Sequence, residues 1–154
     1  FLGAHTFLVE HGGSVTFESD GMLSPTDVGT GPYPLFPTDM QAPFMACQCY
    51  AAGMSTMRET VFEDRFAHVP ELVKMGAKIA LAGCTAFVDG SGGMHGAELV
   101  SRDLRGGAGL VVAALGAKGQ STVSGVHYID RGYEDLPALF RALGARAERR
   151  TVED

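Results

Sequence analysis

The sequence predicts an α/β fold built from a repeated unit, and three observations support this prediction. First, segments 53–65 and 119–131 both open with a Gly and a Thr, continue as an apolar-alternating run and close on an Asp-Arg pair. Second, a helix-like segment that begins with an Asp, at Asp39 and Asp103, precedes each copy. Third, another helix-like segment follows each copy and ends in Gly-Ala. A period of about seventy residues is too long for a solenoid repeat and indicates a duplicated α/β unit.

The composition narrows the class of protein. With 154 residues, 45% of them hydrophobic and 19% charged, the chain has the length and composition of one soluble globular domain. The formal charge of −6 argues against a nucleic-acid partner, which requires a basic surface. No run reaches the roughly eighteen apolar residues of a membrane span, so no membrane association is expected. Three cysteines without a disulfide framework favour the reducing cytoplasm.

The amino-terminal residues, 1–35, are expected to end one repeat unit and to add connecting strands. Segments 6–9 and 15–18 flank a His-Gly-Gly turn, which predicts a hairpin. Segment 25–28 has the pattern of a further strand. Three prolines within 30–37 then predict a rigid, extended loop.

Residues 36–100 are expected to form repeat unit A. Thr38 and Asp39 make a good N-cap pair for a helix over 40–52, and Gly53 provides its stop. The other expected elements of this unit are a strand over 55–60, a short helix over 69–75, a hairpin of 77–81 with 85–88, and a strand over 97–100. The order α-β-α-β-β-β would join its strands through crossover helices.

Residues 101–154 are expected to form repeat unit B. Its predicted elements are a helix over 103–117, a strand through 126, a helix over 136–143 and a strand from 145. Two such units would bury their helices behind two sheets.

The start of the helix at 103–117 carries candidate site residues. Asp103 fits an N-cap, which contributes about 1 kcal/mol. Arg105 is harder to explain, because a cation in the first turn opposes the helix dipole. Glycines at 106, 107 and 109 would each cost about 1 kcal/mol relative to alanine. An anion site at the helix N-terminus and close helix packing both explain these residues, and the sequence leaves both open.

The two Asp-Arg corners, Asp64-Arg65 and Asp130-Arg131, are the other candidate positions. Each follows a predicted strand at its carboxyl end, where α/β sheets usually present ligands. A single pair would be explained by an ion pair or a hydrogen bond that braces the loop. Two equivalent copies with Arg105 as a third cation indicate a phosphate and a carboxylate to be bound.

The cysteines and histidines do not form a metal-ligand pattern. Cys47 and Cys49 are two residues apart on a predicted helix and face different directions. Cys84 lies in a predicted hairpin turn, and the five histidines have no ligand spacing. We expect no metal site and no cofactor.

Five ordered motifs resemble a known family, at residues 36–41, 59–66, 75–77, 103–105 and 129–134. Together they closely resemble the carboxy-terminal part of the enolpyruvyl transferases that act on UDP-N-acetylglucosamine in the first committed step of peptidoglycan synthesis. The resemblance implies an inside-out α/β barrel of βαβαββ units around a pseudo-threefold axis, about two of whose three units are present here. It also implies a second, similar domain across a cleft.

The resemblance also implies residue roles. The family transfers the enolpyruvyl group of phosphoenolpyruvate to the 3-hydroxyl of UDP-N-acetylglucosamine and releases phosphate. It marks six substrate-binding positions: Asp39, Val61, Arg65, Asp103, Arg105 and Arg131. Asp39 would be the general base at the sugar hydroxyl, and Val61 would contact the sugar nucleotide through its backbone. The three arginines would stabilise carboxylate and phosphate charge, with Arg131 a catalytic residue, while Asp103 would position its neighbours.

Other parts of the family site have no counterpart here. These are an amino-terminal Lys-Asn motif, a further arginine and a mobile loop with a reactive cysteine, for which Cys84 is not a substitute. The opening Leu2-Gly3-Ala4 matches the helix ends at 75–77 and 143–145, so we expect a fragment that begins inside a repeat unit. We therefore expect half an active site and little activity alone, with the amino-terminal domain of the same protein as partner. The alternatives are a 3-phosphoshikimate 1-carboxyvinyltransferase-like enzyme, whose characteristic motifs are not found, and a non-catalytic binding or interaction module.

Overall fold

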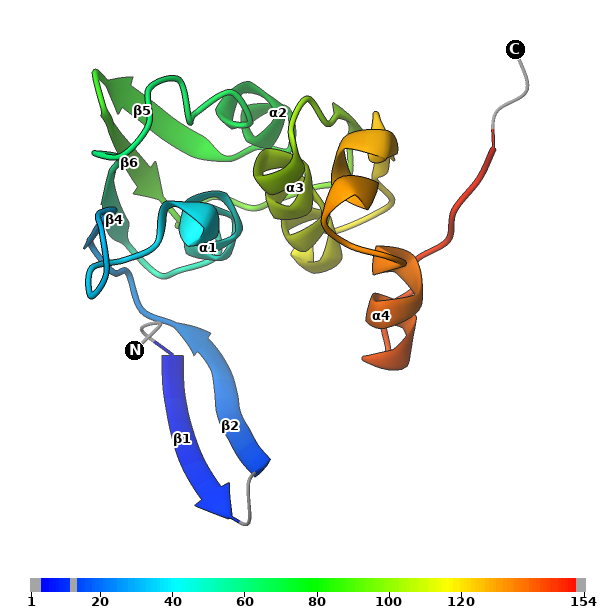
Figure 1. Ribbon diagram of the computed structural model, residues 1–154, viewed down its shortest axis with the longest axis horizontal. Coiled ribbons are helices and arrows are strands. Elements are labelled where there is room, and N and C mark those ends of the chain that lie inside the picture. Colours follow the sequence, from blue (N-terminus) through cyan, green and yellow to red (C-terminus); the bar gives the residue numbers. More distant parts are fainter. Residues whose placement is uncertain (1–3, 12–13, 152–154) are drawn as a thin grey trace.

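The amino-terminal part of the protein is a long antiparallel hairpin. The computed structural model describes residues 4–11 and 14–151, with side-chain burial from residue 20 onward. Strands β1 (Ala4–His11) and β2 (Ser14–Leu23) pair antiparallel and project away from the body of the molecule (Figure 1). The predicted hairpin is confirmed, with strands longer than the sequence pattern indicated.

A four-stranded mixed sheet forms one side of the body, in the order β3-β4-β6-β5. The strands are β3 (Val28–Gly29), β4 (Met54–Arg58), β5 (Lys78–Ala82) and β6 (Thr85–Asp89). β3 pairs parallel with β4, and the other two pairs are antiparallel. The strand predicted over 25–28 is wrong for most of its length. The backbone N–H of Thr26 donates to the side chains of Gln48 and Ser55 rather than to a neighbouring strand.

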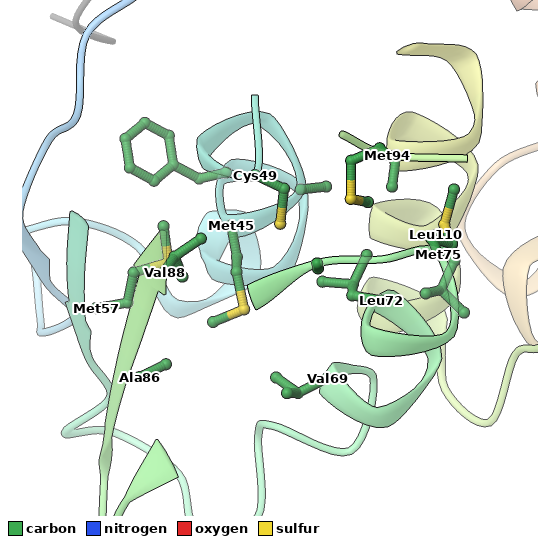
Figure 2. Close-up of a cluster of buried hydrophobic side chains, with 14 of the residues drawn as sticks. Met45, Cys49, Met57, Val69, Leu72, Met75, Ala86, Val88, Met94 and Leu110 are labelled. Carbon is green, nitrogen blue, oxygen red and sulfur yellow. The ribbon is translucent and has the colours of Figure 1, made fainter. Parts of the chain in front are cut away.

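The core lies between this sheet and three helices, α1 (Gln41–Gln48), α2 (Val69–Lys74) and α3 (Leu104–Gly116). Figure 2 shows the buried side chains that meet there. Met45, Met57, Leu72, Met75 and Leu110 are all at most 1% exposed, and they come from both predicted repeat units. Burial of five large apolar side chains in one cluster makes this contact a principal source of stability.

Helices α1 and α3 pack directly against each other at the centre of the molecule (Figure 1). A Cβ on Gly109 would lie 2.9 Å from the backbone of Ala42, and one on Gly107 would lie 2.7 Å from the side chain of Ile129. Close packing therefore explains these two glycines, which the sequence left open between packing and a ligand site.

The remaining elements surround α3. Strand β7 (Glu98–Val100) pairs parallel with β8 (Thr122–Ser124), and α3 is the crossover between them. The short 3-10 helix η2 (Val126–Arg131) packs on α3, and α4 (Leu136–Ala142) follows at the edge.

One strand predicted in this region is present but shorter than expected, and another is absent. The strand predicted through 126 ends at Ser124, because Gly125 adopts a left-handed φ of 70° and starts η2. The Asp130-Arg131 corner therefore lies on a 3-10 helix rather than directly at a strand end. The predicted strand from 145 is absent from the described segment 145–151, where Arg149 pairs with Asp130 instead of a strand neighbour forming a ladder.

The whole arrangement is an α/β fold, as the sequence predicted. The boundaries of the repeat units, at 36–100 and 101–154, stay predictions. Within the described residues no helix is both long and apolar enough to cross a membrane.

Candidate functional site

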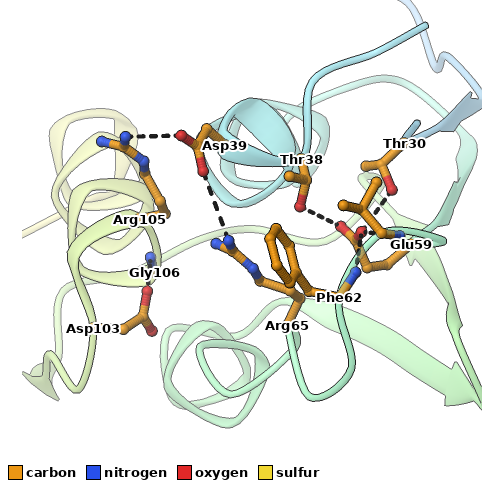
Figure 3. Close-up of polar contacts among 10 residues, drawn as sticks. Thr30, Thr38, Asp39, Glu59, Phe62, Arg65, Asp103, Arg105 and Gly106 are labelled. Carbon is orange, nitrogen blue, oxygen red and sulfur yellow. Dashed lines mark hydrogen bonds and ion pairs between the residues drawn. The ribbon is translucent and has the colours of Figure 1, made fainter. Parts of the chain in front are cut away.

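Asp39 lies in a short 3-10 helix, η1 (Thr38–Met40), that leads into α1. The prediction that Thr38 and Asp39 form an N-cap pair is wrong, because neither η1 nor α1 has a side-chain cap hydrogen bond. The Asp39 carboxylate instead contacts two arginines (Figure 3). Its Oδ2 accepts a hydrogen bond from Arg105 Nη2 at 2.8 Å, and its Oδ1 lies 3.7 Å from Arg65 Nη2.

These contacts change the acidity of Asp39. The hydrogen bond from Arg105 lowers the pKa of the Asp39 carboxyl; partial burial opposes this, and the charges of both arginines add to the lowering. Asp39 in turn raises the pKa of Arg105. The Asp39 side chain is 53% exposed, so water screens the pair. The pair therefore fixes the positions of charged groups at the site and contributes little to the stability of the fold.

The N-terminus of α3 determines the position of Arg105. Asp103 is the N-cap, as predicted, and its Oδ1 accepts a hydrogen bond from the backbone N–H of Gly106 at 2.7 Å. Arg105 follows in the first turn, where its charge opposes the helix dipole. The carboxylate of Asp39 offsets this unfavourable position, because it pairs with the guanidinium directly.

Arg65 comes from the loop between β4 and α2. Asp64, the residue before it, adopts a left-handed φ of 56°, a conformation that Asp tolerates better than most residues. The Arg65 guanidinium carbon lies 4.6 Å from the centre of the Phe62 ring, within cation–π range. Figure 3 shows Arg65 extending from this loop toward Asp39.

Val61 and Arg131 are placed differently from the other predicted residues. The backbone N–H of Val61 donates to Glu59 Oε1 at 2.9 Å, and the Val61 side chain is exposed. Arg131 is exposed at the end of η2, with no side-chain hydrogen bond or ion pair to any other described residue. The structure therefore brings Asp39, Arg65 and Arg105 together and leaves Arg131 outside that cluster.

Two cavities adjoin the cluster and share Asp64, Arg65 and Ala67. The smaller, of about 240 Å³, is lined by Arg65, Asp103 and Arg105 among others. The larger, of about 870 Å³, is open and runs past Val61 to Cys84. A cationic cavity beside a larger open one suits a ligand with a small anionic part and a bulkier part. In the part of the chain that the structure describes, no group of His, Cys, Asp and Glu side chains could hold a metal ion.

Glu59 is a residue that the sequence did not single out, although it lies within one of the family motifs. It is 3% exposed and accepts hydrogen bonds from four groups. The signal in the sequence was the alternation of sides along a strand. If Met57 faces inward and Arg58 outward, Glu59 must face inward, and the structure shows this pattern of burial. An inward carboxylate at a strand end indicates a specific polar role.

Comparison with known proteins identifies the family of this chain. Residues 7–139 match the family described as EPSP synthase (3-phosphoshikimate 1-carboxyvinyltransferase). The chain belongs to the EPSP synthase family.

Individual members of the EPSP synthase family are similar over most of the chain. A protein of Jannaschia sp. named UDP-N-acetylglucosamine 1-carboxyvinyltransferase is 49% identical over 84% of this chain and 31% of its own length. A Finegoldia magna protein of the same name is 44% identical over 99% of this chain and 36% of its own length. The chain thus spans about a third of the length of the curated relatives that it matches.

Solved structures confirm the enolpyruvyl transferase fold. The enolpyruvyl transferase NikO from Streptomyces tendae superposes with a TM-score of 0.84 at 31% identity, over 98% of this chain and 35% of NikO. An EPSP synthase from Acinetobacter baumannii gives a TM-score of 0.56 at 17% identity, over 79% of this chain and 29% of the neighbour, and shows the fold alone.

Proposed function

We propose that this chain is part of a UDP-N-acetylglucosamine 1-carboxyvinyltransferase and forms one side of its active site. The observation that carries the proposal is the Asp39 carboxylate between Arg65 and Arg105. Its support is a set of relatives of that name that are 44–50% identical to this chain. The rest of the longer enzyme would supply the opposite side of the site. Such an enzyme would act in the cytoplasm, in peptidoglycan synthesis, and would need no cofactor.

The reaction assigns one proton to this side of the site. The 3-hydroxyl oxygen of UDP-N-acetylglucosamine would bond to the carbon of phosphoenolpyruvate that carries the phosphate. The hydroxyl proton would pass to Asp39, while the electrons of the double bond would take up a proton at the methylene carbon of phosphoenolpyruvate. The bond from the substituted carbon to the phosphate oxygen would later break to release phosphate, as the neighbouring carbon loses a proton and the double bond forms again. An ionised carboxylate can accept this proton as the new carbon–oxygen bond forms.

The arginines would link substrate binding to the basicity of Asp39. In the free chain the hydrogen bond from Arg105 lowers the pKa of Asp39 and makes it a weak base. The carboxylate and phosphate of phosphoenolpyruvate would offer Arg65 and Arg105 competing anions. As the arginines turn to the substrate, the pKa of Asp39 would rise toward its ordinary value, and the base would become effective only with that substrate bound.

Two substitutions in the full-length enzyme test these roles. Asp39→Asn should lower kcat by roughly 10²- to 10⁴-fold, the usual contribution of a general base, while calorimetry still detects UDP-N-acetylglucosamine binding. Arg131→Ala should raise KM for phosphoenolpyruvate more than it weakens sugar-nucleotide binding, because its exposed guanidinium would bind the anionic substrate. Normal turnover by Asp39→Asn would show that the base lies elsewhere.

The acceptor can be tested directly, since the family description names a different substrate. Phosphate release by the full-length enzyme should occur with UDP-N-acetylglucosamine and not with 3-phosphoshikimate. Release with 3-phosphoshikimate alone would assign the chain to the shikimate-type enzymes instead.

A further inference from the structure

The carboxylate of Glu59 joins three separate segments next to the site. Its Oε1 accepts hydrogen bonds from Thr30 Oγ1 at 2.7 Å, from Val61 N at 2.9 Å and from Phe62 N at 3.3 Å. Its Oε2 accepts a hydrogen bond from Thr38 Oγ1 at 3.0 Å (Figure 3). One side chain therefore connects the segment after β3, the turn of η1 and the loop after β4.

The charge of Glu59 is held by neutral donors. The residue is 3% exposed and has no ion pair with any described residue. Burial raises the pKa of the Glu59 carboxyl, but the hydrogen bonds from Thr30, Val61, Thr38 and Phe62 together outweigh it and leave the pKa below its ordinary value. A buried carboxylate is costly for a fold that needs only stability, because an apolar side chain of similar volume would suit the interior better.

The anchored segments are the ones that carry the acceptor side of the candidate site. Thr38 directly precedes Asp39 in η1, so its tether to Glu59 limits how that turn can move. The N–H of Val61 is occupied by Glu59, and therefore only the carbonyl of Val61 is available to a sugar nucleotide. Thr30 is itself fixed, since Thr60 N donates to its Oγ1 at 2.9 Å.

We propose that Glu59 is a positioning residue for the acceptor substrate, which sets Asp39 through Thr38 and orients the Val61 carbonyl. We assign it no direct contact with substrate, because its carboxylate already accepts four hydrogen bonds within the protein. The inference rests on the proposed function, in which Asp39 and Val61 face the sugar nucleotide. It predicts a larger effect of Glu59 on the sugar nucleotide than on phosphoenolpyruvate, because the link from Glu59 to Arg65 is indirect, through Phe62.

A matched control exists in Glu71 on α2. Glu71 is 5% exposed, and it accepts hydrogen bonds from Val100 N at 3.0 Å and Lys74 Nζ at 2.7 Å. It is thus a second buried, hydrogen-bonded carboxylate, and it lines neither cavity of the candidate site. Glu59→Gln and Glu71→Gln remove one buried charge each, so a general loss of stability should affect both variants.

Steady-state kinetics of the full-length enzyme separate the two roles. Glu59→Gln should raise KM for UDP-N-acetylglucosamine about ten-fold or more, the loss expected for charge-assisted hydrogen bonds, and should change KM for phosphoenolpyruvate much less. Glu71→Gln should change neither KM. Identical kinetics of the two variants would overturn the inference. A wild-type enzyme that transfers nothing to UDP-N-acetylglucosamine would instead overturn the proposed function, and this inference with it.

A second substitution keeps the test decisive if Glu59→Gln does not fold. Thr38→Val removes one of the four hydrogen bonds and leaves the Glu59 charge in place, whereas Thr38→Ser keeps the hydroxyl. Thr38→Val should raise KM for the sugar nucleotide, and Thr38→Ser should restore it. No rise with Thr38→Val would contradict the proposal. If both variants fold, the double variant should show less than the product of the two single effects, because the substitutions break one shared contact.

Discussion

The sequence around Asp39 indicated a site residue but did not indicate the contacts of its side chain. Its position before a helix predicted an N-cap, and its motif predicted a site residue. The first prediction is wrong because two guanidinium groups from distant segments occupy its oxygens. The residues near Asp39 in the sequence do not indicate these partners, because Arg65 lies in a distant loop and Arg105 lies on α3. The crossing of α1 and α3 brings them together, and that crossing is a property of the packed fold.

His68 makes a pH prediction possible at the residue scale. It is 4% exposed, and its Nε2 has no hydrogen-bond partner among the described residues. Burial lowers the pKa of His68 from 6.5 to about 4, against the opposing charge of Asp103 and a hydrogen bond to the backbone of Arg65. Between these pH values the unfolded chain binds a proton that the native protein does not. The free energy of unfolding should therefore fall as the pH decreases from 6.5 to about 4.

Urea unfolding across that pH range checks this prediction. His68→Gln should flatten the decline, because an amide does not titrate, and His127→Gln, at an exposed position, should leave it as in the wild type. A decline that persists unchanged in His68→Gln would assign the pH dependence to other groups.

Among the secondary-structure elements, helices whose apolar residues repeat at helical spacing over a long segment were predicted most reliably. The helix over 103–117 is present as α3 with its predicted Asp103 cap, because a cap and a periodic apolar face are both local signals. The strands predicted at 25–28 and from 145 are wrong or largely wrong. A strand needs a neighbour to complete its hydrogen bonds, and alternation along one segment does not show whether that neighbour exists.

The contact between α1 and α3 should be intolerant of a single methyl group. Gly109→Ala would place a Cβ 2.9 Å from the backbone of Ala42, so the helices would have to move apart. We expect it to lower the free energy of unfolding by about 1–3 kcal/mol, even though alanine is the better helix former. Chemical denaturation measures the loss. Leu115→Ala, at an exposed position of the same helix, should have a small effect, and an equal loss there would contradict the packing explanation.

At the scale of the whole molecule, the chain presents an open surface at the site. It spans about a third of the length of its curated relatives, and the larger of the two cavities is open to solvent. Leu139 and Leu143 on and just after α4 are 54% and 75% exposed. These two leucines lie four residues apart and form a small exposed apolar surface at this end of the chain.

Calorimetry on the 154-residue chain tests whether the candidate site binds a substrate without the rest of the enzyme. We expect no saturable heat with UDP-N-acetylglucosamine, because half of the contacts would come from the rest of the enzyme. The full-length protein, titrated under the same conditions, should bind it. Clear saturable binding by the short chain would favour a free-standing binding module over part of an enzyme.

The pairing of Asp39 with Arg105 has a consequence for inhibitor screening. A tethered carboxylate competes with any added anion at an effective concentration in the millimolar range or above. Anionic fragments of weaker affinity would be missed in a screen on the wild-type chain, although their complementary guanidinium groups are present. A screen on Asp39→Asn would reveal such fragments, since the internal competitor is removed while Arg65 and Arg105 remain.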